Sequence, residues 1–125
     1  MKLVDTSSWV EYLRDHESSV GDRVEALVLR GEAAWCDITL VELWHGVRGA
    51  KEKRELTEME KEIERIAVHA AVWRLASKLA LRSREKGINA PISDLVTAAC
   101  AVTHGLELEH CDKHYDDLMP LTHSL

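Results

Sequence analysis

Short apolar segments alternate with amphipathic helical segments along this chain. Strands are expected over residues 2–5, 33–36 and 106–111, with a further short strand at 66–68. Between them, apolar residues recur at the three- and four-residue spacing of helices that bury one face. Strands that alternate with helices are typical of an α/β fold with a parallel sheet. We therefore expect an α/β fold with a mainly parallel sheet.

The expected helices are delimited by residues that commonly begin or end helices. Ser7 or Ser8 is the expected N-cap of the first helix, which carries Trp9. Further elements are expected as follows: helices over residues 20–30, from 39 onward, over 51–65, from about 72 to a stop near Gly87, and from Pro91 and Ser93 to a stop at Gly105, then a last short strand around Leu121.

Composition limits the class of protein. The chain has 125 residues, of which 46% are hydrophobic and 30% charged, so we expect a single globular domain over residues 1–125. No apolar stretch approaches the roughly 20 residues that cross a bilayer. The N-terminus turns polar at Asp5, before any export signal, and the three cysteines fit reduced thiols. A cytoplasmic location is expected. The net charge of −6 neither supports nor excludes a polyanionic substrate.

Four acidic residues occupy junctions between expected elements: Asp5, Glu42, Asp94 and Asp112. In open parallel sheets, ligands bind beyond the carboxyl ends of the strands, where Asp5 and Asp112 are expected. Four converging carboxylates repel one another unless a hard divalent cation holds them together. The pattern therefore favours a metal site at one edge of the sheet.

Each acidic residue also has a purely structural interpretation. Asp5 suits a turn or cap, and Asp112 suits a polar loop. Glu42 follows Thr39 at capping-box spacing, in which a glutamate bonds back to the N-cap amide. Asp94 in a first helical turn is favoured by the helix dipole. The metal-site prediction therefore depends on the order and common edge of the four residues.

Four ordered segments carry a family resemblance: VDTSSW at 4–9, TLVELWHG at 39–46, ISDLVTAA at 92–99 and CDKHY at 111–115. Together they resemble the PIN-domain nucleases, most closely the toxin components of VapBC-type toxin–antitoxin pairs. The resemblance covers essentially the whole chain. It implies a three-layer α/β/α fold and a Mg²⁺- or Mn²⁺-dependent endoribonuclease.

The resemblance also implies roles for individual residues. Asp5, Glu42, Asp94 and Asp112 become the acidic metal site, with Asp5 and Asp94 expected in direct contact with the cation. Thr6 becomes the hydroxyl that orients a metal-bound water. The expected reaction is hydrolysis of RNA by activated water, without a covalent enzyme intermediate. Cys111 stands where the family often has Thr or Ser.

The partners implied by the resemblance are RNA, a cognate antitoxin and a second copy of the chain in a homodimer. The antitoxin is expected as a helix in an apolar groove lined by helices near Trp9 and Trp44. RNA needs positive charge to offset its backbone. The candidates are the basic residues that follow Glu42 in sequence: Arg48, Lys51, Lys53 and Arg54. A second basic set, Arg74, Lys78 and Arg82, is interpreted as a solvated helix face.

Several alternatives stay open. His114 is interpreted as a surface-loop histidine rather than a general acid or zinc ligand, because no second ligand pair has zinc-site spacing. Asp116 and Asp117 are interpreted as loop residues and a helix start rather than site residues. The rival functions are a catalytically inactive PIN-like module that binds RNA or protein, and a DNA-directed nuclease. Receiver domains and haloacid-dehalogenase-type phosphatases are disfavoured because Asp5 lacks the second acidic residue that each would require.

Overall fold

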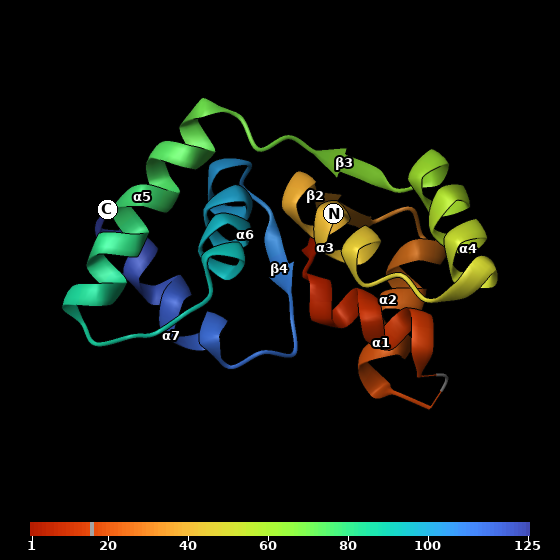
Figure 1. Ribbon diagram of the computed structural model, residues 1–125. Helices are drawn as coiled ribbons and strands as arrows, with labels where there is room; N and C mark the ends of the chain where they lie inside the picture. The colour runs from red at the N-terminus through yellow and green to blue at the C-terminus, as the bar shows by residue number, and fades with distance from the viewer. Residues whose placement is uncertain (16) are drawn as a thin grey trace.

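A parallel sheet of four strands in the order β3-β2-β1-β4 forms the centre of the molecule (Figure 1). The computed structural model describes residues 1–15 and 17–125. The strands are β1 (Lys2–Val4), β2 (Ala33–Cys36), β3 (Glu64–Ile66) and β4 (Glu107–Glu109). In the register, Lys2 of β1 pairs with Ala33 on one side and with Glu107 on the other. The prediction of a parallel sheet is confirmed.

Helices cover both faces of this sheet. They are α1 (Thr6–Arg14), α2 (Ser19–Leu29), α3 (Asp37–His45), α4 (Gly49–Glu62), α5 (Ala70–Glu85), α6 (Ile92–Thr103) and α7 (His114–Leu121), followed by the 3₁₀ turn η1 (Thr122–Ser124). Helices α1 to α4 lie on one side of the strands and α5 to α7 on the other (Figure 1). The three-layer α/β/α architecture is confirmed.

The strand residues divide between two cores because successive side chains of a strand point to opposite faces. Leu3 packs with Val72 of α5 and Val96 of α6. Val4, its neighbour, packs instead with Trp9 of α1 and other residues of the second face. Both strand residues are fully buried, so a one-residue slip in register would exchange their two environments.

Trp9 and Trp44 differ in burial. Trp9 has no exposed surface, and its ring centroid lies 5.1 Å from that of Trp35 in β2. Trp44 is only partly buried, and its indole N–H donates a 2.6 Å hydrogen bond to Glu60 of α4. Trp9 is therefore a core residue, whereas Trp44 joins α3 to α4 at the surface.

Several sequence predictions about local structure were wrong. The strand expected over 106–111 is only Glu107–Glu109, and the helix expected from 39 begins at Asp37. Asp5 is the N-cap of α1, in place of Ser7 or Ser8. The third strand is Glu64–Ile66 rather than 66–68, and α4 begins at Gly49 rather than 51. Leu121 ends helix α7 and belongs to no strand, since its segment packs against the ends of α5 and α6 in a small apolar cluster. Among the described residues, no helix has both the length and the apolar character needed to span a membrane.

Candidate active site

Asp5 lies directly after β1 and caps helix α1. Its Oδ1 accepts a 3.0 Å hydrogen bond from the amide of Ser8, and its Oδ2 accepts a 2.8 Å bond from the hydroxyl of Ser7. The residue is only 3% exposed. A carboxylate oxygen can accept more than one bond, so the capping role leaves acceptor capacity for a cation. The structural interpretation of Asp5 is thus correct and compatible with a functional one.

Glu42 does not take part in a capping box. Helix α3 begins at Asp37, so Thr39 lies inside the helix and is fully buried rather than serving as its N-cap. One turn further along, Glu42 accepts a 2.7 Å hydrogen bond from the Thr6 hydroxyl of α1. The capping-box interpretation is therefore wrong, and Glu42 is held at the start of α1.

Asp94 and Asp112 form the tightest part of the acidic edge, together with His114. The His114 Nδ1 lies 3.2 Å from Oδ2 of Asp94 and 3.1 Å from Oδ1 of Asp112. One ligand atom from each of the three residues falls within 4.8 Å of the others. Helix α6 supplies Asp94 in its first turn, and the segment between β4 and α7 supplies Asp112.

His114 was misjudged from the sequence. It is not in a surface loop but begins helix α7, and its backbone amide donates a 2.9 Å bond to Asp112. Its place between two carboxylates depends on the turn that precedes α7, which periodicity does not reveal. Asp116 and Asp117 lie exposed in the first turn of α7, so the interpretation as a helix start is confirmed.

Tyr115 is a site residue that sequence reasoning missed. Its hydroxyl donates a 3.2 Å hydrogen bond to Oδ1 of Asp94, although its ring is almost completely buried. Leu118 follows it by three residues on the buried side of α7. A buried tyrosine usually has a partner for its hydroxyl. The sequence feature that could have revealed Tyr115 is its three-residue spacing from Leu118, which places both residues on the buried side of α7.

The pKa values of Asp94 and Tyr115 are shifted by burial and by neighbouring negative charges. Burial raises the pKa of the Asp94 carboxyl above its usual range, and repulsion from Asp112 adds to the effect, while contacts with His114 and Tyr115 oppose it. Burial likewise raises the pKa of the Tyr115 hydroxyl, and the charges of Asp5 and Asp94 raise it further. The charges of Asp5 and Asp94 therefore both raise the pKa of the same phenol.

A second link joins Asp5 to the segment that carries Asp112. The Asp5 amide donates a 3.1 Å bond to the carbonyl of Glu109, at the end of β4. The thiol of Cys111 lies 3.4 Å from the Ser7 hydroxyl that bonds Asp5. Asp5 and Asp112 thus follow the neighbouring strands β1 and β4, Asp94 lies near Asp112 through His114, and Glu42 is linked to the residue after Asp5 through Thr6.

The residues at this edge fit a divalent cation. Carboxylate oxygens are the ligands that Mg²⁺ and Mn²⁺ prefer. Asp94 and Asp112 offer such oxygens close together, and the imidazole of His114 adds one nitrogen donor. Burial and the nearby charge of Asp112 both raise the pKa of Asp94, and a bound cation would favour the charged form of both carboxyls.

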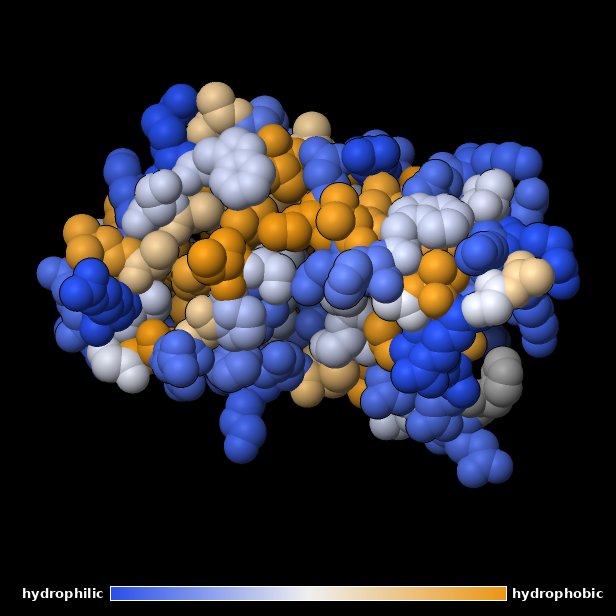
Figure 2. Space-filling model, in the orientation of Figure 1, coloured by the Kyte–Doolittle hydropathy of each residue, from blue (hydrophilic) through white to orange (hydrophobic). Residues whose placement is uncertain are grey.

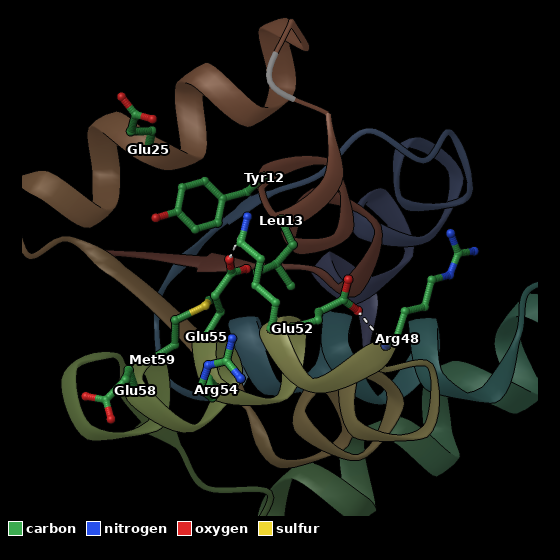
Figure 3. A pocket seen from close by; sticks show the side chains of 10 residues that line it. Tyr12, Leu13, Glu25, Arg48, Glu52, Arg54, Glu55, Glu58 and Met59 are labelled. Atoms are coloured by element: carbon green, nitrogen blue, oxygen red, sulfur yellow. Dashed lines mark hydrogen bonds and ion pairs between the residues drawn. The ribbon is translucent and has the colours of Figure 1, made fainter.

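The predicted RNA-contact residues lie elsewhere, on α4. A groove of about 650 Å³ separates α4 from α1 and α2. Arg48, Lys51 and Arg54 line it, whereas Lys53 is exposed on α4 and does not. Figure 3 shows Arg48 and Arg54 together with the carboxylates of the same groove, which come from Glu25, Glu52, Glu55 and Glu58.

The groove lies near the far end of α1 from Asp5. Arg14, the last residue of α1, donates a 2.8 Å bond to Glu52 of α4 and another to the carbonyl of Gly46. Nine helical residues span about 13 Å at 1.5 Å per residue. The basic residues of α4 therefore flank the acidic edge at a distance and do not touch it.

Comparisons with known proteins agree with this architecture. Residues 2–118 match the profile of the PIN domain. Ribonuclease VapC21 of Mycobacterium tuberculosis is 30% identical over 112 residues, which cover 87% of this chain and 81% of that protein. Ribonuclease VapC11 of the same species is 29% identical over 126 residues, covering 98% and 94%. The crystal structure of VapBC2 from Rickettsia felis bound to a promoter DNA fragment contains a chain with a TM-score of 0.80, at 21% identity and with 95% and 92% coverage.

Proposed function

The chain belongs to the PIN-domain family, and from that premise we propose that it is a metal-dependent endoribonuclease that acts as the toxin of a toxin–antitoxin pair. The observation that carries the proposal is the cluster of Asp94, Asp112 and His114, whose ligand atoms lie close enough to share one ion, beside the strand β1 that precedes Asp5. The ribonuclease names of relatives near 30% identity support RNA as the substrate.

The four carboxylates would have different roles in the acidic site. Asp94 and Asp112 would hold the cation, which we propose to be Mg²⁺ or Mn²⁺, and Asp5 and Glu42 would complete the acidic site. When bound, such a cation polarises a phosphate and lowers the pKa of water. The Thr6 hydroxyl donates its hydrogen bond to Glu42, so its oxygen can accept a hydrogen bond from a water and orient that water.

A cognate antitoxin is the proposed protein partner. The relatives named VapC and the VapBC2 structure support a partner of this kind. We place it in the groove between α4 and the helices α1 and α2, where Tyr12, Leu13 and Met59 provide apolar contacts (Figure 3). The expectation of a groove lined by helices near Trp9 and Trp44 leads to this place, because α1 carries Trp9, although Trp9 itself is fully buried and does not line the groove.

A homodimer is the proposed assembly of the toxin itself. Apolar residues form a band across the face on which α3 and α6 lie (Figure 2). Val41 of α3, Trp73 of α5 and Val102 of α6 are among the exposed large apolar side chains on the helices. Exposed apolar surface of this kind commonly marks an interface. Sedimentation equilibrium should therefore give twice the 14.1 kDa chain mass.

The experiment that tests the proposed function is cleavage of total RNA by partner-free protein. We expect discrete fragments with Mn²⁺ or Mg²⁺ and none after chelation. Asp94→Asn should abolish cleavage while Asp22→Asn, a matched change on the exposed start of α2, should not. Equal cleavage by the Asp94→Asn protein would reject the site. DNA offered beside RNA distinguishes the rival DNA-directed nuclease, and inactivity of all proteins would favour the inactive binding module.

A further inference from the structure

We infer that Tyr115 is a positioning residue that fixes Asp94 and Asp112 relative to each other for cation binding. The inference rests on the proposed function and adds a residue to it. Two observations carry it: the Tyr115 hydroxyl bonds the Asp94 carboxylate, and the Tyr115 backbone bonds the residue that bears the second carboxylate.

The ring of Tyr115 is held on several sides. It is 1% exposed and lies in an apolar cluster with Leu79 of α5, Leu95 of α6 and Leu118 of α7. The His110 ring covers it at a centroid distance of 5.0 Å. A side chain packed by three helices has little rotational freedom. The phenolic oxygen is therefore a fixed point next to the acidic edge.

The fixed hydroxyl of Tyr115 orients the carboxylate of Asp94. Its hydroxyl donates to Oδ1 of Asp94, so the other oxygen, Oδ2, is the one that faces His114. A donor on one carboxylate oxygen restricts rotation of the group. The hydrogen bond thus selects which Asp94 oxygen is presented to Asp112 and to a cation between them.

The same residue also holds the turn that carries Asp112. The Tyr115 amide donates a 3.2 Å bond to the Asp112 carbonyl. Within this turn the Asp112 side chain accepts the amide of His114. Tyr115 is therefore bonded both to α6, through Asp94, and to the turn before α7. It spans the two elements whose carboxylates must converge.

The two hydrogen bonds of Tyr115 should strengthen cation binding because the carboxylates of Asp94 and Asp112 repel each other. His114 contacts both carboxylates, but their mutual repulsion still favours turning apart, and binding of a cation would then have to bring them back together. A donor that already holds one of them reduces this reorganisation. Loss of hydrogen-bonding partners behind metal ligands typically weakens metal binding about 10- to 100-fold.

The test is Mn²⁺ binding by the full chain, measured by isothermal titration calorimetry, in the wild type and in Tyr115→Phe. This substitution keeps the buried ring and removes only the hydroxyl. We expect about tenfold weaker Mn²⁺ binding. Ser83→Ala is the matched control, because it removes a buried hydroxyl on α5 that donates a hydrogen bond to the carbonyl of Ala80, within the same helix. It should bind Mn²⁺ like the wild type.

A second readout separates positioning from general destabilisation. The Mn²⁺ concentration that gives half-maximal RNA cleavage should rise about tenfold in Tyr115→Phe, and saturating Mn²⁺ should restore most of the rate. Unchanged Mn²⁺ affinity in Tyr115→Phe, with binding abolished in Asp94→Asn, would overturn the role of Tyr115 and leave the proposed function standing. Absence of Mn²⁺ binding by the wild type would overturn both.

Discussion

The hydroxyl of Thr6 donates a 2.7 Å hydrogen bond to Oε1 of Glu42, which joins the first residue of α1 to the middle of α3. The two residues are 36 positions apart in sequence. Through this bond the carboxylate of Glu42 is held beside Asp5, which immediately precedes Thr6. The contact gives both residues a structural basis for the roles proposed for them.

Replacing Thr6 should therefore impair cleavage without unfolding the protein. Thr6→Val keeps the shape of the side chain but removes the hydroxyl, so Glu42 loses its donor and a water loses its acceptor. We expect RNA cleavage to fall about 10- to 100-fold, as for other hydrogen-bonding partners behind a metal site. Thr6→Ser should restore most of the rate. Equal rates in Thr6→Val and wild type would contradict the role of the hydroxyl.

Cys111 provides a chemical probe of the acidic edge. It is exposed, whereas Cys36 and Cys100 are buried, and its thiol lies 3.4 Å from the Ser7 hydroxyl that bonds Asp5. Alkylation with iodoacetamide should add bulk between Asp5 and Asp112 and reduce RNA cleavage at least tenfold, since small misplacements of catalytic groups are costly. Mass spectrometry should locate one adduct.

Cys111→Ser is the control for this experiment. The hydroxyl can keep the contact with Ser7 but does not react with the reagent, so the treated and untreated variant should cleave RNA equally. Full activity of wild-type protein that carries the adduct would place the reaction away from this edge.

Charge reversal on α4 tests whether RNA binds along this helix. Charge reversal of Arg48 and Lys51 together should weaken RNA binding and flatten its dependence on salt, since each lost phosphate contact lowers the slope by about one. Fluorescence anisotropy at several salt concentrations measures that slope. Reversal of Arg74 and Lys78, exposed on α5, is the comparison and should leave the slope unchanged. A flatter salt dependence in the α5 variant, with an unchanged one in the α4 variant, would indicate that RNA binds along α5 instead.

The proposed antitoxin groove has its own test in Met59. This side chain lies on the apolar side of α4 that faces Tyr12 and Leu13 across the groove (Figure 3). Met59→Glu should weaken antitoxin binding by more than tenfold, because a charge would be buried in an apolar contact. Thr57→Glu, on an exposed position of the same helix, should bind normally. Equal affinity of both variants, measured by calorimetry, would place the antitoxin elsewhere.

The sequence predicted the strands β1, β2 and β4, the parallel sheet and the four acidic residues, because these depend on local patterns. Apolar runs mark buried strands, and acidic residues at their ends are visible in one dimension. The roles of Glu42, His114 and Tyr115 depended on contacts across 20 or more positions, such as Thr6 with Glu42 and Tyr115 with Asp94. Such contacts arise only when helices pack, so the capping-box rule gave Glu42 the wrong partner, and His114 was expected in a surface loop without a partner.

The ion pair between Arg14 and Glu52 predicts a dependence of stability on pH. The hydrogen bond from the Arg14 guanidinium holds the pKa of the Glu52 carboxyl below its ordinary value of 4.5. A group whose pKa is lower in the folded state stabilises the protein above its unfolded pKa and loses that contribution as pH falls through the folded pKa. The pair is partly exposed, so its contribution should not exceed about 1 kcal/mol.

Thermal unfolding of wild type and Glu52→Gln between pH 7 and pH 3 measures this effect. The wild type should unfold at the higher temperature at pH 7, and the difference should shrink as pH falls below about 4.5. Glu64→Gln, an exposed glutamate in β3, is the matched control and should show little difference at either pH. A difference for Glu52→Gln that persists undiminished at pH 3 would show that Glu52 stabilises the junction of α1 and α4 through packing rather than through its charge.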